Sequence, residues 1–181
     1  MSLKDFELLE KFCQADTQHY AFHLLVKKYQ EKVYWHIRKM VISHEDADDL
    51  TQEVFIKVWE KLNTFRQQSQ LYTWIYRIAT NECLNFLTKK RKRFFLPIHD
   101  IASELAEKLE QNAYLSGDEV QLKLRKALLK LPDKQRLVFN MKYFDDMSYQ
   151  DMSEILGTSV GALKASYHHA VKKIEEYLKK H

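Results

Sequence analysis

Two stretches of the chain carry the side chains most suited to binding chemistry, and the first reads FRQQSQLYTWIYRIATNECLNFLTKKRKR, from Phe65 to Arg93. Its aromatic side chains alternate with side-chain amides, and it ends in five consecutive lysine and arginine residues. Aromatic rings stack on unpaired bases, amides hydrogen-bond to base edges, and cations neutralise phosphates. The alternative for one ring, that of Trp74, is a place in the core. The predicted contacts with opened nucleic acid are Tyr72, Trp74, Tyr76, Arg77, Asn81, Asn85, Lys89, Lys90 and Arg91.

The second stretch runs from Met147 to Glu176 and is predicted to form two helices. The second of these helices places hydrogen-bond donors on one face and has no acid before Glu175. A helix of this kind fits the major groove, where its early residues reach base edges and its basic end lies near phosphates. The pattern favours recognition of duplex DNA, and the alternative is a basic face that is only solvated. The donors are Lys164, Ser166, His168, His169, Lys172 and Lys173.

Capping residues indicate the elements that position these donors. Ser148 is a good N-cap residue, and Asp151 three positions later predicts a reciprocal capping box for a helix over 149–156. Gly157 then supplies the left-handed residue that ends a helix. Ser159 caps a second helix of about six turns, and we also expect it to contact DNA. The stretch is therefore predicted to be a helix-turn-helix.

An acidic cluster follows another predicted helix start, Ser43 with Asp46, whose apolar stripe continues to Leu62. Acids in a first turn suit the positive end of the helix dipole. Here they continue past what capping needs, which favours a docking surface for a basic partner. A metal site is a third interpretation, although no His or Cys recurs at ligand spacing within the cluster. The residues expected to lead the docking surface are Asp48, Asp49, Gln52 and Glu53.

The predicted fold class is all-α, because strand-like alternation is absent and the 181 residues include only three glycines and two prolines. Charge divides the chain. Residues 1–93 hold 16 basic and 12 acidic side chains, residues 99–121 hold one and six, and residues 122–181 hold 12 and seven. We therefore expect two small helical domains, 1–93 and 118–181, joined by a flexible acidic linker over 94–117.

Several classes of protein are disfavoured by what the sequence lacks. Cys13 and Cys83 lie far apart in the sequence, which predicts neither a zinc site nor a disulfide framework. No apolar leader and no run of 18 apolar residues occurs, so we expect a cytoplasmic protein that does not span a membrane. No constellation of paired carboxylates and histidine supports catalysis, so we expect no enzyme activity, no cofactor and no small-molecule substrate.

In their order and separation, four segments resemble the extracytoplasmic-function (ECF) group of bacterial RNA polymerase sigma factors. One helix-turn-helix is shared by many regulators, whereas four ordered segments across nearly the whole chain are specific. The segments are DADDLTQEVFIKVWEKL, FRQQSQLYTWIYRIATNECLNFLTKKRKR, LPDKQRLVFNMKYFDDMSYQDMSEILG and SVGALKASYHHAVKKI.

The resemblance implies a promoter-melting domain and an upstream-element domain, with a linker that threads toward the active-site and RNA-exit channels of polymerase. The DLTQEVF segment would dock on the clamp coiled coil of the large polymerase subunit. The helix over 72–85 would open the minus-ten element, with Asn81 helping to hold a flipped base. The implied partners are core RNA polymerase, promoter DNA and an anti-sigma factor, often membrane-bound in this family.

The residues that read or flank the minus-thirty-five element by this resemblance are Lys164, Ala165, His168 and His169. The chain departs here from the commoner pattern, because Ser166 and His169 stand where that pattern has cations. Arginine makes bidentate contacts to guanine, which serine and neutral histidine do not. The resemblance therefore places this helix on the upstream element but leaves open which sequence it reads.

Two other functions remain as alternatives. A homodimeric helix-turn-helix regulator acting on duplex DNA would explain Met147 to Glu176 but would give the aromatic helix over 72–85 no role. A metal-dependent nuclease would use the acids near Asp46, without the histidine and carboxylate arrangement that such chemistry needs.

Overall fold

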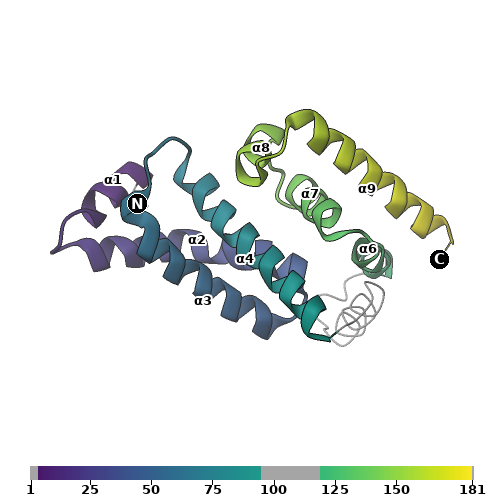
Figure 1. The fold of residues 1–181 in the computed structure, drawn as a ribbon, viewed down its shortest axis with the longest axis horizontal. Helices are drawn as coiled ribbons and strands as arrows, with labels where there is room; N and C mark the ends of the chain where they lie inside the picture. Colours follow the sequence, from purple (N-terminus) through teal and green to yellow (C-terminus); the bar gives the residue numbers. More distant parts are fainter. Residues whose placement is uncertain (1–3, 95–118, 181) are drawn as a thin grey trace.

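The computed structural model describes residues 4–94 and 119–180, which form eight α-helices and one short 3₁₀ turn and contain no strand (Figure 1). The predicted all-α class is confirmed. The predicted linker lies outside the described residues, except for Phe94 at the end of α4. The helices are α1 Asp5–Phe12, α2 Gln18–Val41, α3 His44–Lys61, α4 Leu71–Phe94, α6 Glu119–Leu129, α7 Asp133–Tyr143, α8 Tyr149–Leu156 and α9 Val160–Lys180.

The first four helices form one group, in which α2, α3 and α4 pack against one another and α1 packs on α2. Their contacts are apolar, because each helix repeats buried side chains at helical spacing, as Val33, Ile37 and Met40 do on α2. The start of α3 has the predicted cap, since Ser43 Oγ accepts a hydrogen bond from the Asp46 backbone N–H at 3.3 Å. This bundle fixes the outward face of α4.

The last four helices form the second group, with α9 packed across α6, α7 and α8 (Figure 1). A small core joins α6, α7 and α9, and Phe139 stacks on Tyr167 within it at 5.7 Å between ring centroids. Because Ala170 and Ile174 of α9 are buried in this core, the opposite face of α9 is directed outward. This second group therefore presents one long helix on a short scaffold.

The two groups of helices pack on each other, α4 against α8 and α2 against α7. A single apolar cluster continues from the first group into the second and includes Met141, Met152 and Leu163. Polar contacts join the groups as well, including the hydrogen bond from Arg136 to the carbonyl of Met40 at 3.1 Å. The predicted domain boundaries at 93 and 118 stay a prediction.

Candidate nucleic-acid interface

The helix-turn-helix is formed by α8 and α9, and α8 has the predicted bounds. The Ser148 hydroxyl accepts from the Asp151 backbone N–H at 3.0 Å, as expected of an N-cap. The reciprocal half of the capping box differs, because the Asp151 carboxylate accepts from the Ser148 hydroxyl at 2.6 Å instead of from its backbone N–H. Gly157 has φ +61°, the left-handed conformation that ends α8. The turn therefore forms as the sequence indicates, but the predicted hydrogen bond from the Ser148 backbone N–H to Asp151 is replaced by one from the Ser148 hydroxyl.

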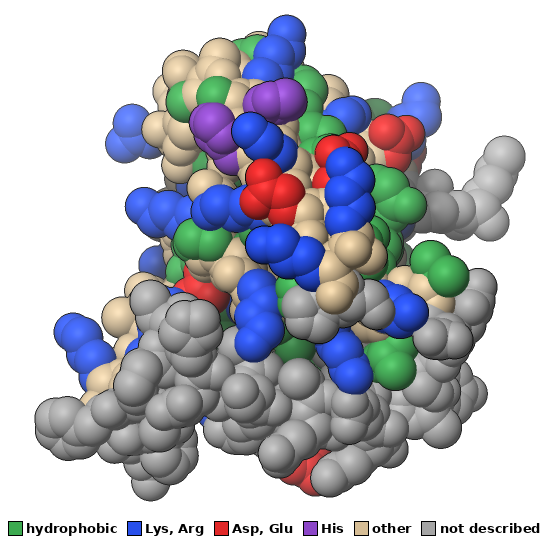
Figure 2. Space-filling view, turned by 90° about the vertical axis from the view of Figure 1, so that its right-hand side faces the viewer, with side chains coloured by type: hydrophobic (Ala, Val, Ile, Leu, Met, Phe, Trp, Pro, Cys, Tyr) green, Lys and Arg blue, Asp and Glu red, His purple; other side chains and the backbone are tan. Residues whose placement is uncertain are grey.

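The outward face of α9 is open. Ser159 Oγ accepts from the Ala162 backbone N–H at 3.3 Å, which caps the helix. Lysine and arginine side chains gather with histidines over the end of the molecule that carries α9 (Figure 2). Lys173 also donates to Gln135 at 3.0 Å. Ser166, one of the donors predicted on this face, is half-buried. The other predicted contacts are exposed: Ser159, Lys164, Ala165, His168, His169, Lys172 and Lys173.

The structure brings the predicted amides of α4 together in one exposed row. Asn81, Asn85 and Lys89 are exposed and follow one another at four-residue spacing. Residues four apart are neighbours on a helix surface, so two amides and a cation form a continuous polar stripe. Amides donate and accept hydrogen bonds, and the lysine can pair with a phosphate. This stripe matches the chemistry that an opened DNA strand requires.

The predicted aromatic contacts of α4 lie deeper than its amides. Tyr76 is only 3% exposed, and its hydroxyl donates to the Lys32 carbonyl at 3.2 Å. Its ring lies 4.3 Å from that of half-buried Tyr72, whose pKa is raised to about 12 by burial and by the charge of Asp145. Trp74 is half-buried beside Phe65. In this arrangement Tyr76 is a core residue, not the surface contact that the sequence predicts, because its position on α4 faces α2.

Three of the predicted cations of α4 have partners on other helices. The Arg77 guanidinium donates to the carbonyl of Glu154 on α8 at 2.5 Å. Lys90 pairs with Asp46 at 3.3 Å, and Arg91 forms an ion pair with Asp133 on α7. The contacts of Arg77 and Arg91 join the two groups of helices. A contact of these cations with phosphate would therefore compete with their contacts to other helices.

The acidic surface lies on the outward side of α3. Asp49, Gln52 and Glu53 are exposed, and Asp48 is half-exposed and lies 3.3 Å from the His44 ring nitrogen Nε2. Ile56, which sequence reasoning missed, is 58% exposed and continues the same stripe. Its position three residues after Glu53 and four after Gln52 is the signal that would have found it.

An apolar groove adjoins this acidic surface. It has a volume of about 580 Å³ and is formed by α2 and α3, with Phe22, Ile56 and Trp59 among its walls. Trp59 packs edge-on against Phe22, with ring centroids 4.9 Å apart. An exposed isoleucine beside a groove is the arrangement expected of a protein contact surface. The acids and the groove together form a mixed apolar and acidic patch.

Among residues 4–94 and 119–180, no three side chains of His, Cys, Asp or Glu are grouped to hold a metal ion. Within the same residues, no helix has both the length and the apolar character needed to cross a bilayer. The acids at the start of α3 instead have nearby protein partners, since Asp46 pairs with Lys90 and Asp48 lies beside His44.

A helix-turn-helix whose second helix exposes cations and imidazoles defines a helical DNA-binding protein. Residues 25–93 match the family described as Sigma-70 region 2, and residues 121–174 match Sigma-70, region 4. The chain belongs to the sigma-70 family of RNA polymerase sigma factors, in its ECF group. The predicted resemblance is thereby confirmed.

Relatives agree over almost the full length. The RNA polymerase sigma-H factor of Pseudomonas aeruginosa is 31% identical over 97% of this chain and 94% of its own. The ECF RNA polymerase sigma-E factor of Haemophilus influenzae is 32% identical over 96% and 94%. The solved structure of CnrH in complex with the cytosolic domain of CnrY has the same fold, with a TM-score of 0.70, 23% identity and 97% coverage of both chains.

A second solved structure shows the same fold. It is the sigma factor RpoE in complex with the anti-sigma factor NepR from Bartonella quintana, with a TM-score of 0.66 and 22% identity. It covers 87% of this chain and 96% of its own. The arrangement of helices is therefore shared with sigma factors whose sequences have diverged widely.

Proposed function

We propose that this sigma factor binds core RNA polymerase, holds the minus-thirty-five element with α9 and opens the minus-ten element with α4. The two exposed polar faces carry the proposal: the open face of α9 and the stripe of Asn81, Asn85 and Lys89. One suits the edges of paired bases and the other suits an unpaired strand. No catalytic group of its own is needed.

Strand opening on this proposal works by differential binding. Extruding a base costs a few kcal/mol, which is offset by stacking and hydrogen bonds that form only with the opened strand. Asn81 lies on the exposed stripe and has both a donor and an acceptor for the edge of a flipped base. Trp74, half-buried beside Phe65, offers only part of its ring to stacking. The amides therefore carry most of the proposed contact.

Polymerase docking on this proposal uses the patch of Asp48, Asp49, Gln52 and Glu53 on α3, extended by Ile56. The acids would steer and pair with a basic partner surface, and Ile56 would enter an apolar pocket at the centre of the contact. Docking on polymerase places both DNA sites at high effective concentration, so that weak separate affinities are sufficient. An anti-sigma factor is the second partner class that we propose, with the same patch as its target.

Transcription in vitro tests the proposal most directly. Purified chain is added to core polymerase with a library of promoter fragments, and the start sites of the transcripts are mapped. We expect transcripts from a restricted set of promoters that depend on the added chain. Failure to join core polymerase, or transcripts without any choice of start site, would contradict the proposal.

A further inference from the structure

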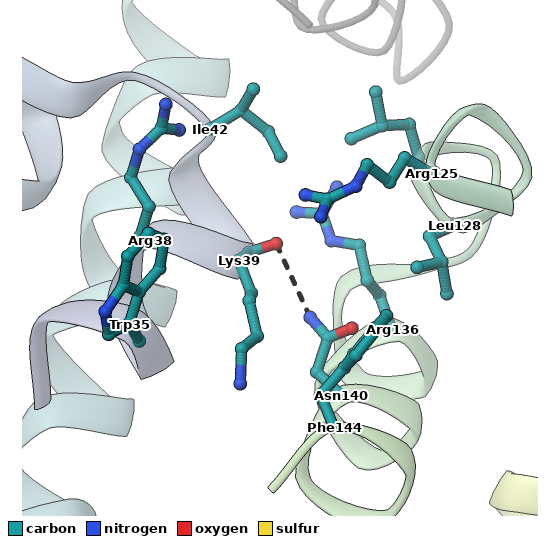
Figure 3. Close-up of a pocket in the computed structure, with 10 residues that line it drawn as sticks. Trp35, Arg38, Lys39, Ile42, Arg125, Leu128, Arg136, Asn140 and Phe144 are labelled. Carbon is teal, nitrogen blue, oxygen red and sulfur yellow. Dashed lines mark hydrogen bonds between the residues drawn. The ribbon is translucent and has the colours of Figure 1, made fainter. Parts of the chain in front are cut away.

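A cavity of about 90 Å³ lies where the two groups of helices meet, between α2 on one side and α6 and α7 on the other (Figure 3). Three arginines line it: Arg38 from α2, Arg125 from α6 and Arg136 from α7. The guanidinium groups of Arg125 and Arg136 lie next to each other, and Arg38 stands across from them on α2 (Figure 3). The cavity is thus cationic on both sides of the junction.

Polar atoms in this cavity are buried without partners. Arg38 is 4% exposed, Arg136 3% and Asn140 2%. Within the described residues, Nη1 of Arg38, Nε of Arg136 and Oδ1 of Asn140 have no hydrogen-bond partner. A buried donor that gives up water without gaining another partner is destabilising, and more so when it is charged. Such atoms indicate a site whose ligand supplies the missing bonds.

The charge around the cavity is unbalanced. Asp133 pairs with Arg136 and also with Arg91, which lies outside the cavity lining. Burial and the nearby charge of Arg38 lower the pKa of Arg125. Arginine nevertheless stays protonated in proteins. Of the four cations that line the cavity, Arg136 pairs with Asp133 and Lys39 with Asp145, whereas no ion pair in the described part of the chain involves Arg38 or Arg125, which leaves room for an anion.

The shape of the cavity limits the anion. A volume of about 90 Å³ is far below the roughly 300–1,000 Å³ of pockets for drug-sized ligands, so only a small group fits. Guanidinium forks bind oxyanions through paired N–H bonds. Asn140 Oδ1 can accept from the hydroxyl of hydrogen phosphate. Trp35 and Phe144 line the cavity and are partly exposed, so the site opens to solvent beside them.

We propose that this cavity binds a phosphate group, either free phosphate or the phosphate of a small phosphorylated metabolite, through Arg38, Arg125 and Arg136. Because Arg38 belongs to the first group of helices and the other two arginines to the second, the bound anion joins the two groups. Phosphate binding thereby stabilises the packed arrangement of α4 on α8. This effect rests on the proposed function: the bound phosphate lowers the fraction of the sigma factor that is free to engage polymerase and DNA.

Titration calorimetry of the full chain with inorganic phosphate, at constant ionic strength set with potassium chloride, tests the site. We expect saturable binding to one site and a rise in the midpoint of thermal unfolding as phosphate is added. The variant R125Q should bind at least about tenfold more weakly, since one charge-assisted contact is worth roughly 1.5–3 kcal/mol. R38Q is a second variant, and circular dichroism checks that both fold.

The variant K134Q is the matched control, because Lys134 is an exposed cation on α7 that does not line the cavity. Its phosphate affinity should equal that of the unchanged chain. Adenosine monophosphate distinguishes the sources: binding as tight as phosphate supports a phosphorylated metabolite, and weaker binding supports free phosphate. No saturable binding of either ligand, or binding of phosphate by R125Q and R38Q as tight as by the unchanged chain, would overturn the proposal. Calorimetry uses no polymerase, so a failed transcription assay would count against the proposed function alone.

Discussion

The two helices proposed to contact DNA, α4 and α9, differ in how free their polar faces are. The face of α9 is exposed along its length, and of its predicted contacts only Lys173 has a hydrogen-bond partner on another helix, Gln135, among those described here. On α4, by contrast, Tyr76 is buried and Arg77 donates to the carbonyl of Glu154 on α8. The stripe of Asn81, Asn85 and Lys89 stays exposed.

This difference corresponds to two kinds of recognition. Reading duplex DNA needs a preformed helix that enters a groove, and α9 meets that requirement without rearrangement. Holding an opened strand needs aromatic and cationic groups beside the amides, and on α4 some of those groups are engaged by the other half of the chain. We infer that α8 and α7 must leave α4 before Arg77 and Arg91 can meet an opened strand.

The largest expected effect separates the two helices by function. Replacing Asn81 with alanine removes a donor and an acceptor that we assign to the flipped base, without touching a buried contact. We expect open-complex formation to fall about tenfold, as for loss of a base contact worth ~1.4 kcal/mol. Closed-complex binding, which depends on α9, should change little. Permanganate reactivity of promoter thymines measures opening, and gel mobility measures the closed complex.

Asn63→Ala supplies the control for this experiment. Asn63 is an exposed asparagine in the 3₁₀ turn between α3 and α4, outside the proposed contacts. Its replacement should leave both assays unchanged. Normal promoter melting with N81A would show that the stripe on α4 does not hold the opened strand. The proposed division of roles, duplex DNA for α9 and opened DNA for α4, would then be wrong.

The next expected effect concerns the contacts between the two groups of helices, which cover part of α4. Asp145, in the turn before α8, forms an ion pair with Lys39 and lies 3.5 Å from the His36 ring nitrogen Nδ1, both on α2. Replacing Asp145 with asparagine leaves the partly buried Lys39 without a counter-charge. We expect the free energy of unfolding to fall by about 1–2 kcal/mol. Asp146→Asn is the matched control, because that side chain is 98% exposed.

The same carboxylate predicts a pH dependence. Burial acts to raise the pKa of Asp145, but the interactions with His36 and Lys39 outweigh it and hold the pKa below its usual value of 3.8. The stabilising contribution is thus fully present above pH 3.8 and disappears as pH falls through the lower folded-state value. Acid unfolding curves should show this loss in the unchanged chain and not in D145N. Parallel curves would argue that the ion pair contributes nothing.

Local signals in the sequence predicted the helices and the open face of α9, but not the junction. Ser148, Gly157 and Ser159 act on the backbone within a few residues, so their types determine the turn wherever the helices pack. The burial of Tyr76 and the pairing of Arg91 with Asp133 depend on which distant helix arrives opposite α4. That information lies in contacts between residues far apart in sequence, so helical spacing alone did not reveal it.

A smaller effect tests whether the open face of α9 depends on the turn before it. Gly157 has φ +61°, whereas Gly161 lies in the first turn of α9. At either position an added Cβ would meet no atom within 4 Å. Backbone conformation therefore decides the outcome. G157A should lower the free energy of unfolding by about 1 kcal/mol, and G161A should raise it by up to about 1 kcal/mol. Urea unfolding of the two variants measures the difference, and equal effects would contradict the turn's role.

The smallest expected effect concerns a single phosphate contact on α9. Lys172 is exposed beside the proposed base contacts, whereas Lys179 is exposed two turns further on, outside them. Replacing Lys172 with alanine should weaken promoter binding about equally for all sequences and reduce the slope of log K against log salt by about 1. Lys179→Ala should leave the slope unchanged. Equal salt slopes for the two variants would mean that Lys172 does not contact a phosphate. The exposure of a side chain on α9 would then not predict its contact with DNA.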